Sequence, residues 1–138
     1  MTVGVLIITH DNIGPSLLNI ANDILGSCPL QLKVLHVTRA SHLEFLQAQA
    51  QVLINSLDTG HGVLILTDMY GSTPSNIACN AADKKHAQVV SGLNLPMLIR
   101  VLNYSRLSLN ELTEKAISGG REGVHICLTT IEKHNDTR

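Results

Sequence analysis

Residues 3–11 read Val-Gly-Val-Leu-Ile-Ile-Thr-His-Asp, an unbroken apolar run that ends abruptly in polar side chains. Strands that are buried on both faces, as in a parallel sheet, have such continuous runs of branched residues. Residues 62–67, Gly-Val-Leu-Ile-Leu-Thr, repeat the pattern and are followed by a polar cluster that starts at Asp68. The two runs predict two buried strands of one mainly parallel sheet.

The remaining segments alternate between strand and helix patterns. Further strands are expected at 32–37, 88–90 and, near the end of the chain, 124–130. Apolar residues at helical spacing predict five helices: from residue 17 to Gly26, 41–57 with Ser41 as N-cap, from Thr73 as N-cap to about 83, 96–104, and 109–118 with Gly119-Gly120 as the stop. This order predicts an α/β fold with a doubly wound, mainly parallel sheet and helices on both faces.

Composition limits the classes of protein that remain. A chain of 138 residues, 44% hydrophobic, fits one domain, and a net charge of -1 argues against nucleic acid as a partner. No apolar run approaches the roughly 20 residues that a membrane span needs, and no cationic segment precedes the first one, so we expect a cytoplasmic protein. The three widely spaced cysteines are expected to be reduced and mostly buried.

The carboxyl ends of two strands are where chemistry is expected. In open α/β sheets, ligands bind beyond the carboxyl ends of the strands, where the strand order reverses. If the order is 2-1-3-4, the residues that follow the first and third strands, 9–12 and 68–73, are neighbours. His10 and Asp68 then face each other across the switch point.

This pair suits phosphoryl transfer. A carboxylate on one imidazole nitrogen fixes the tautomer and leaves the other nitrogen to attack phosphorus. Helix N-termini near 14–15 and 73–74 and the hydroxyls of Thr9, Ser72 and Thr73 are candidate donors to the phosphate, and Gly71 would allow close approach of the backbone. From the residues alone, each member of the pair is also explained as a turn or packing residue, and only their combination favours chemistry.

Two other classes share this fold pattern. A receiver-like domain would be phosphorylated on Asp68, but it needs an acidic pair after the first strand and a lysine after the last parallel strand, and both are missing. A flavin-binding module would need aromatic rings to enclose the flavin, whereas Phe45, Tyr70 and Tyr104 are the only aromatic residues.

Four blocks of sequence together resemble the enzyme IIA component of the mannose (mannose/fructose/sorbose) family of the bacterial phosphoenolpyruvate-dependent sugar phosphotransferase system (PTS). The blocks are the first strand ending in Ile-Thr-His10 and residues 66–76, 91–98 and 120–124, in the family's order. The resemblance implies a IIA domain over residues 1–131, with a polar tail at 132–138.

The resemblance also implies an activity. The protein would be a phosphotransferase component that accepts a phosphoryl group on His10 from the histidine-containing phosphocarrier protein HPr and passes it to an enzyme IIB. Asp68 would hydrogen-bond the histidine, and the Thr73 hydroxyl would lie near the phosphate. No metal or cofactor is implied, and contact with the membrane would be indirect, through the transporter complex. The last strand, 124–130, would run antiparallel and be exchanged in a homodimer.

Three departures from the family pattern stand out. Asp11 follows the histidine where the family commonly has glycine, and its carboxylate would repel a phosphoryl group. Residues 71–74 read Gly-Ser-Thr-Pro where the family often has Gly-Gly-Ser-Pro. The sequence ends without the linker and IIB domain that many relatives carry, so we expect a separate acceptor. A phosphohistidine switch that binds a regulator remains an alternative to a role in sugar transport.

Overall fold

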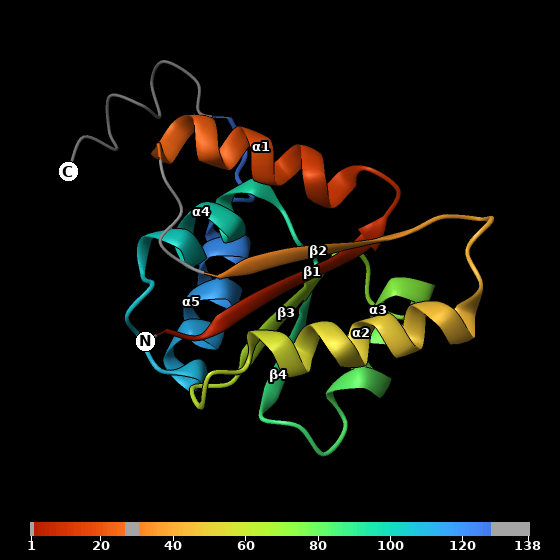
Figure 1. Cartoon of the computed structure of the whole chain (residues 1–138). Helices are drawn as coiled ribbons and strands as arrows, with labels where there is room; N and C mark the ends of the chain where they lie inside the picture. Colours follow the sequence, from red (N-terminus) through yellow and green to blue (C-terminus); the bar gives the residue numbers. More distant parts are fainter. Residues whose placement is uncertain (1, 27–30, 128–138) are drawn as a thin grey trace, which may run out of the picture.

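The computed structural model describes residues 2–26 and 31–127. Its elements alternate along the chain as β1 (Gly4–His10), α1 (Ile13–Leu25), β2 (Leu32–Val37), α2 (Leu43–Leu57), β3 (Val63–Thr67), α3 (Thr73–Ala82), β4 (Ala87–Ser91), α4 (Leu95–Asn103) and α5 (Leu109–Glu122). Figure 1 shows the sheet at the centre of the molecule with the helices around it. The α/β fold predicted from the sequence is confirmed.

The strands of the described residues form one parallel sheet in the order β2-β1-β3-β4. In its register Ile8 lies beside Leu35 on one side and Thr67 on the other, so β1 and β3 end next to each other. The order 2-1-3-4 places the switch point, where the strand order reverses, between β1 and β3. His10 and Asp68 therefore emerge at the switch point, as the sequence predicts.

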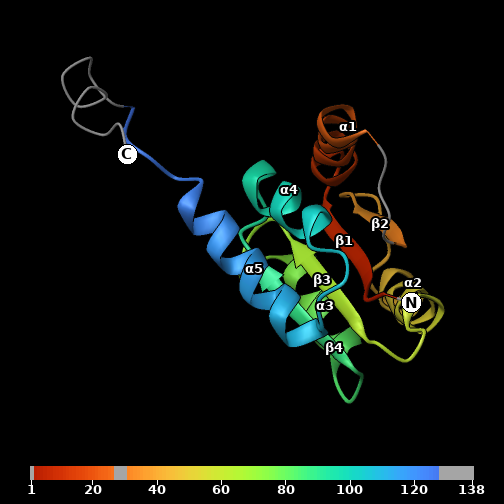
Figure 2. The ribbon, with the colours of Figure 1, turned by 90° about the vertical axis from the view of Figure 1, so that its left-hand side faces the viewer.

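Helices cover both faces of this sheet. Val5 and Ile7 of β1 face one core, which α1, α4 and α5 close with side chains such as Leu98 and Leu112. Leu6 and Ile8 face the other core, beneath α2 and α3. Successive side chains of a strand point to opposite faces, so a continuous apolar run fills both cores. Figure 2 separates α1, α4 and α5 on one side of the sheet from α2 on the other.

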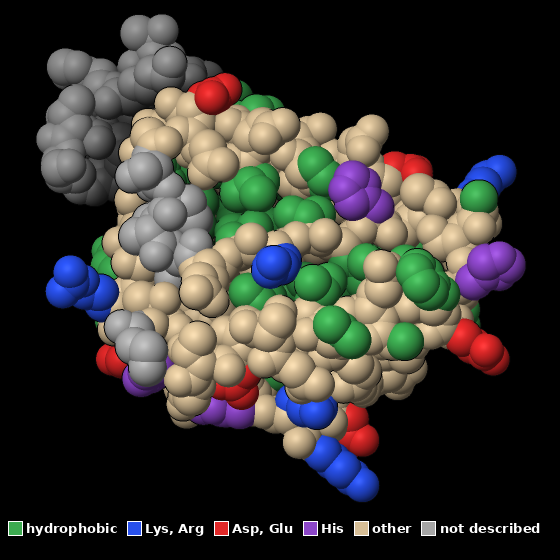
Figure 3. Space-filling view, in the orientation of Figure 1, with side chains coloured by type: hydrophobic (Ala, Val, Ile, Leu, Met, Phe, Trp, Pro, Cys, Tyr) green, Lys and Arg blue, Asp and Glu red, His purple; other side chains and the backbone are tan. Residues whose placement is uncertain are grey.

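The strand β2 forms one edge of the sheet. On this side of the molecule, hydrophobic side chains gather across the middle of the surface between α1 and α2 (Figure 3). Phe45 and Val52 of α2 belong to the exposed apolar residues, with 61% and 65% of their surfaces accessible.

Several predicted helix limits are wrong for a local reason. Ser41 is not the cap of α2, because its hydroxyl bonds to Thr38 in the preceding turn, and His42 takes the cap position. Ser72, not Thr73, is the N-cap residue of α3. Pro15 lies in the first turn of α1, which starts at Ile13, one turn earlier than the apolar spacing indicates.

The glycine pair predicted to stop the last helix lies inside α5, which continues to Glu122. Gly119 and Gly120 face α4: a Cβ on Gly119 would lie 2.7 Å from the Cβ of Arg100, and one on Gly120 would lie 2.8 Å from Cε of Met97. The two glycines allow the helices to approach closely, so their role is packing rather than termination.

The end of the described chain differs from the predicted last strand. Residues 124–127 form no strand, and 128–130 lie outside the described residues, as does the predicted tail at 132–138. The chain leaves α5 in a direction away from the sheet (Figure 2). All four strands that the structure describes are parallel, so an antiparallel strand is not seen in them.

The cysteine prediction is only partly right. Cys79 and Cys127 are free thiols, but both are exposed rather than buried, and Cys28 lies outside the described residues. Within the described ranges, each helix is too short or too polar to cross a membrane.

Candidate active site at the switch point

The imidazole of His10 and the carboxylate of Asp68 form the centre of the site. The Nδ1 atom of His10 lies 2.8 Å from Oδ2 of Asp68, and the backbone N–H of His10 donates to the same oxygen at 3.1 Å. The two side chains come from the ends of adjacent strands, although 58 residues separate them in the sequence. The predicted juxtaposition is therefore present.

Burial differs between the two partners. The side chain of His10 is 42% exposed, whereas that of Asp68 is 9% exposed. The second carboxylate oxygen, Oδ1, accepts the N–H of Met69 at 3.1 Å. Both oxygens of Asp68 are thus engaged, and the carboxylate is held in one orientation.

The tautomer of His10 follows from this contact. A carboxylate accepts hydrogen bonds, so the proton of a neutral ring resides on Nδ1. The lone pair is then on Nε2, which has no hydrogen-bond partner among the described residues. The arrangement presents a nucleophilic nitrogen with its tautomer fixed by a buried acid.

The loop from Asp68 to Thr73 leads into the N-terminus of α3. Gly71 lies in the left-handed region at φ 80°, where glycine carries no steric penalty. The Ser72 hydroxyl donates to the carbonyl of Met69 at 2.6 Å, which closes the turn and occupies the hydroxyl hydrogen that the sequence suggests for phosphate binding. Thr73 is exposed in the first turn.

The start of α3 is suited to bind an anion. Within the described part of the chain, the N–H groups of Thr73 and Ser75 have no acceptor, and the Ser72 side chain makes no capping bond. Unpaired N–H groups and the positive end of the helix dipole favour a phosphate at this position.

The N-terminus of α1 is less available than the sequence indicates. Thr9 is completely buried, and its Oγ1 accepts the N–H of Gly14 at 2.8 Å. Pro15, the next residue, has no N–H to offer. Thr9 therefore holds α1 against β1 and is not at the surface where a phosphate arrives, which corrects its predicted role as a phosphate ligand.

Asp11 occupies a left-handed backbone conformation, which glycine adopts without strain. Its φ is +41°, and its N–H donates to the carbonyl of Val37 at 3.0 Å. Aspartate is one of the few residues other than glycine that tolerates this region. Asp11 is exposed, so its charge lies at the surface directly after His10.

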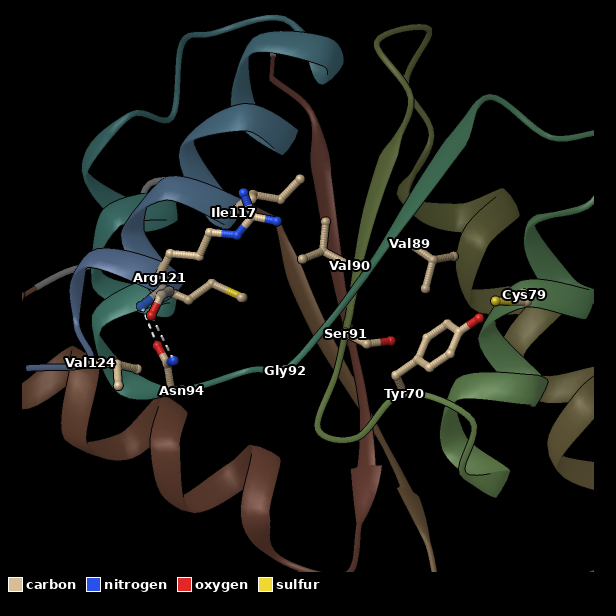
Figure 4. A pocket seen from close by; sticks show the side chains of 12 residues that line it. Tyr70, Cys79, Val89, Val90, Ser91, Gly92, Asn94, Ile117, Arg121 and Val124 are labelled. Atoms are coloured by element: carbon tan, nitrogen blue, oxygen red, sulfur yellow. Dashed lines mark hydrogen bonds between the residues drawn. The ribbon is translucent and has the colours of Figure 1, made fainter.

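A hollow of about 520 Å³ lies beside this loop, over the end of β4. Tyr70, Ser91, Asn94 and Arg121 are among the residues that line it, and Figure 4 shows Tyr70 on one side of β4 and Arg121 on the other. Asn94 caps α4 by accepting the N–H of Met97 and donates to the carbonyl of Gly120 on α5. Sequence reasoning did not identify this hollow, because it joins residues from four separate segments.

No metal centre is formed in the part of the chain that the structure describes: there, no three side chains of histidine, cysteine, aspartate or glutamate are placed to hold a metal ion together. The chemistry of the site rests on the His10–Asp68 pair and on the donors around it.

Fold and site together define a class: a doubly wound parallel α/β domain with an accessible histidine, paired to a buried carboxylate, at the switch point of its sheet. Among known families, the model of the "PTS system fructose IIA component" matches residues 4–117. The chain therefore belongs to this family of IIA components of the sugar phosphotransferase system, as its four sequence blocks indicate.

Individual relatives agree with this assignment. The mannose-specific EIIAB component of the PTS of Escherichia coli K12 is 34% identical over 127 residues, and the match covers 90% of this chain. The chain spans only 39% of the length of that relative. The fructose-specific EIIA component of Bacillus subtilis is 28% identical over 102 residues, 70% of either chain.

Solved structures share the fold. The mannose/sorbose-specific IIA subunit of Enterococcus faecalis superimposes with a TM-score of 0.83 at 24% identity, covering 94% of this chain and 97% of that one. The EIIA component of Streptococcus agalactiae gives a TM-score of 0.75 at 23% identity, covering 90% of this chain and 96% of that one.

Proposed function

We propose that the protein is a phosphocarrier that accepts a phosphoryl group on Nε2 of His10 from phosphorylated HPr and passes it to an enzyme IIB. The observation that carries this proposal is the 2.8 Å contact between Nδ1 of His10 and Oδ2 of Asp68, on a ring that is 42% exposed. The buried acid orients the ring, and exposure lets a donor protein reach the opposite nitrogen.

Each bond that forms in the proposed phosphoryl transfer is matched by one that breaks. The lone pair of Nε2 attacks phosphorus, a P–N bond forms on His10, and the P–N bond of the donor breaks. The positive charge that develops on the ring is stabilised by Asp68, which accepts the Nδ1 proton in its hydrogen bond. The N–H groups of Thr73 and Ser75 and the Thr73 hydroxyl are the donors proposed for the phosphoryl oxygens.

The surface around His10 supports a protein as the partner. Ile13, Met69 and Tyr70 follow β1 and β3 at the same edge and are exposed by 44%, 59% and 85%. Exposed apolar and aromatic side chains around a reactive group are typical of sites where one protein docks on another. We propose a cytoplasmic role in sugar uptake, in which the membrane transporter is reached through IIB.

We also propose that two copies associate by exchanging the chain beyond α5. The strand β4 is an edge of the described sheet, and an open edge pairs readily with another strand. Val124 and Ile126 are 78% and 88% exposed on a segment that has no strand partner among the described residues. A strand from a second copy would cover β4 and bury both side chains.

The test of the phosphocarrier proposal uses phosphoenolpyruvate, enzyme I and HPr as the source of label. We expect a label that is stable to base and lost in acid, as for a phosphohistidine, and no label in His10→Ala. A label that is cleaved by hydroxylamine and survives in His10→Ala would instead identify an acyl phosphate on Asp68 and would overturn the proposal. Transfer onward is tested by adding a IIB protein and measuring loss of label.

The same assay tests Asp68. We expect Asp68→Ala to be labelled more slowly but not to lose labelling, because the ring remains while the bond that fixes its tautomer is gone. A charge-assisted hydrogen bond contributes about 1.5–3 kcal/mol, which corresponds to roughly 10- to 150-fold in rate. Labelling of Asp68→Ala at the wild-type rate would contradict the role of the carboxylate.

A further inference from the structure

Three hydroxyl groups meet beside the His10–Asp68 pair and were not identified from the sequence. Oγ1 of Thr67 lies 2.8 Å from Oγ of Ser91, and Oγ of Ser75 lies 3.5 Å from the same Ser91 oxygen. Thr67 is completely buried and Ser75 is 2% exposed. Ser91 thus contacts two buried hydroxyls from two other elements.

The three hydroxyls come from three elements that border the site. Thr67 is the last residue of β3 and directly precedes Asp68. Ser75 lies in the first turn of α3, two residues after Thr73. Ser91 ends β4, and two residues later the N–H of Leu93 donates to the carbonyl of Thr67 at 2.9 Å. The end of β4 is therefore joined both to the end of β3, directly before Asp68, and to the helix turn that is proposed to bind the phosphate.

We propose that Ser91 is a positioning residue of the phosphoryl site. Its hydroxyl holds the first turn of α3 against the end of β3, so that the N–H groups of α3 stay aligned with the His10–Asp68 pair. A serine hydroxyl donates one hydrogen bond and accepts two, so it serves Thr67 and Ser75 together. This inference rests on the proposed phosphocarrier function.

Loss of the Ser91 hydroxyl acts on the transferred group, not on the imidazole. Thr67 and Ser75 would lose their common partner, and the first turn of α3 would lose its hydroxyl contact with the end of β4. A small displacement of groups that align a reacting centre slows the reaction strongly. The contact between His10 and Asp68 does not involve these hydroxyls, so we expect it to remain in the variant.

Ser91 can be changed without opening the core. It is half-buried and lines the hollow beside Tyr70, and its side-chain oxygen points toward Tyr70 in Figure 4. Thr67 offers a matched pair of variants: Thr67→Val keeps the shape and removes the hydroxyl, whereas Thr67→Ser keeps the hydroxyl.

The experiment measures kcat and KM for phosphoryl transfer from phosphorylated HPr to His10. We expect Ser91→Ala and Thr67→Val each to lower kcat about tenfold with KM for the donor unchanged, and Thr67→Ser to keep most of the wild-type kcat. The double variant Ser91→Ala/Thr67→Val should be no slower than Ser91→Ala, because the contact that Thr67→Val removes is already lost in Ser91→Ala. The NMR signal of the His10 Nδ1 proton should be unchanged in Ser91→Ala.

Three outcomes overturn the inference while the phosphocarrier function stands. They are a wild-type kcat in Ser91→Ala, additive losses in the double variant, and a rise in KM with kcat unchanged. If Thr67→Val fails to fold, Ser75→Ala replaces it in the same comparison with Ser91→Ala. Absence of label on His10 of the wild-type protein overturns the proposed function itself, and is seen before any variant is compared.

Discussion

At the scale of single residues, the charge next to the histidine is the feature that bears most on the proposed phosphoryl site. Asp11 places an exposed carboxylate directly after His10. A phosphoryl group carries close to two negative charges. Two unit charges about 8 Å apart in water repel each other by about 0.5 kcal/mol. On the proposed phosphohistidine, Asp11 would therefore favour release of the phosphoryl group over its retention.

We expect Asp11→Asn to hold a larger share of the phosphoryl group at equilibrium with HPr, by about two- to fivefold at low salt. Asparagine also tolerates the left-handed backbone, so the variant changes charge and not conformation. Asp23→Asn, an equal charge change at an exposed position of α1, is the control and should match the wild type. An effect that persists unchanged at high salt would contradict an electrostatic origin.

At the scale of elements, the crossing of α4 and α5 depends on glycine. Alanine in a helix is favoured over glycine by about 1 kcal/mol, so Gly→Ala stabilises a helix unless the new Cβ collides. At Gly119 the obstacle is Cβ of Arg100, which is fixed to the backbone of α4, whereas at Gly120 it is the mobile end of Met97. We expect Gly119→Ala to lower the free energy of unfolding by about 1–3 kcal/mol and Gly120→Ala to stay within about 1 kcal/mol of the wild type. Urea unfolding measures both, and the reverse order would contradict this packing.

The turn between α2 and β3 makes the stability of the folded protein depend on pH. The N–H of Gly60 donates to Oδ1 of Asp58 at 2.8 Å and that of Gly62 at 3.1 Å, and these bonds hold the pKa of the Asp58 carboxyl below its ordinary value of 3.8. A lowered folded pKa stabilises the protein above the unfolded pKa, and this stabilisation is lost as the pH falls through the folded value.

We expect Asp58→Asn, which keeps an oxygen acceptor and removes the charge, to lower the free energy of unfolding at pH 7 by less than about 1 kcal/mol, because solvent screens this carboxylate. The difference from the wild type should shrink as the pH falls below 3.8. Thermal unfolding at several pH values checks this. A difference that instead grows toward acid pH would contradict a lowered pKa of Asp58 in the folded protein.

At the scale of the whole molecule, the proposed exchange of the chain after α5 between two copies predicts a definite mass in solution. We expect sedimentation to give the mass of two copies for the wild type, and Val124→Asp or Ile126→Asp to shift the mass toward one copy, since a buried unpaired carboxylate opposes association. Val52→Asp places the same charge on α2, at a residue that is 65% exposed, and should leave the mass unchanged. A wild-type protein that sediments as one copy at all concentrations would contradict the exchange.

The four described strands and the α/β order could be predicted from the amino-acid sequence. Both follow from local signals, because a run of apolar residues indicates a buried strand and the end of a strand shows where its polar residues emerge. The meeting of His10 with Asp68 was predicted only for the strand order 2-1-3-4, and the folded sheet supplies that order. The same local signals misplaced the cap of α2, ended α5 at Gly119, and assigned Thr9 to the phosphate.

These last features required the folded molecule, because each depends on a partner from elsewhere in the fold or on competition for one hydrogen bond. Gly119 serves close packing within α5 because Arg100 leaves no room for a Cβ, and Thr9 is a buried anchor because its oxygen accepts the N–H of Gly14. The contact of Ser91 with Thr67 joins the ends of two strands. Burial and secondary structure produce periodic patterns in a single sequence. A contact between two residues from distant segments produces no such pattern.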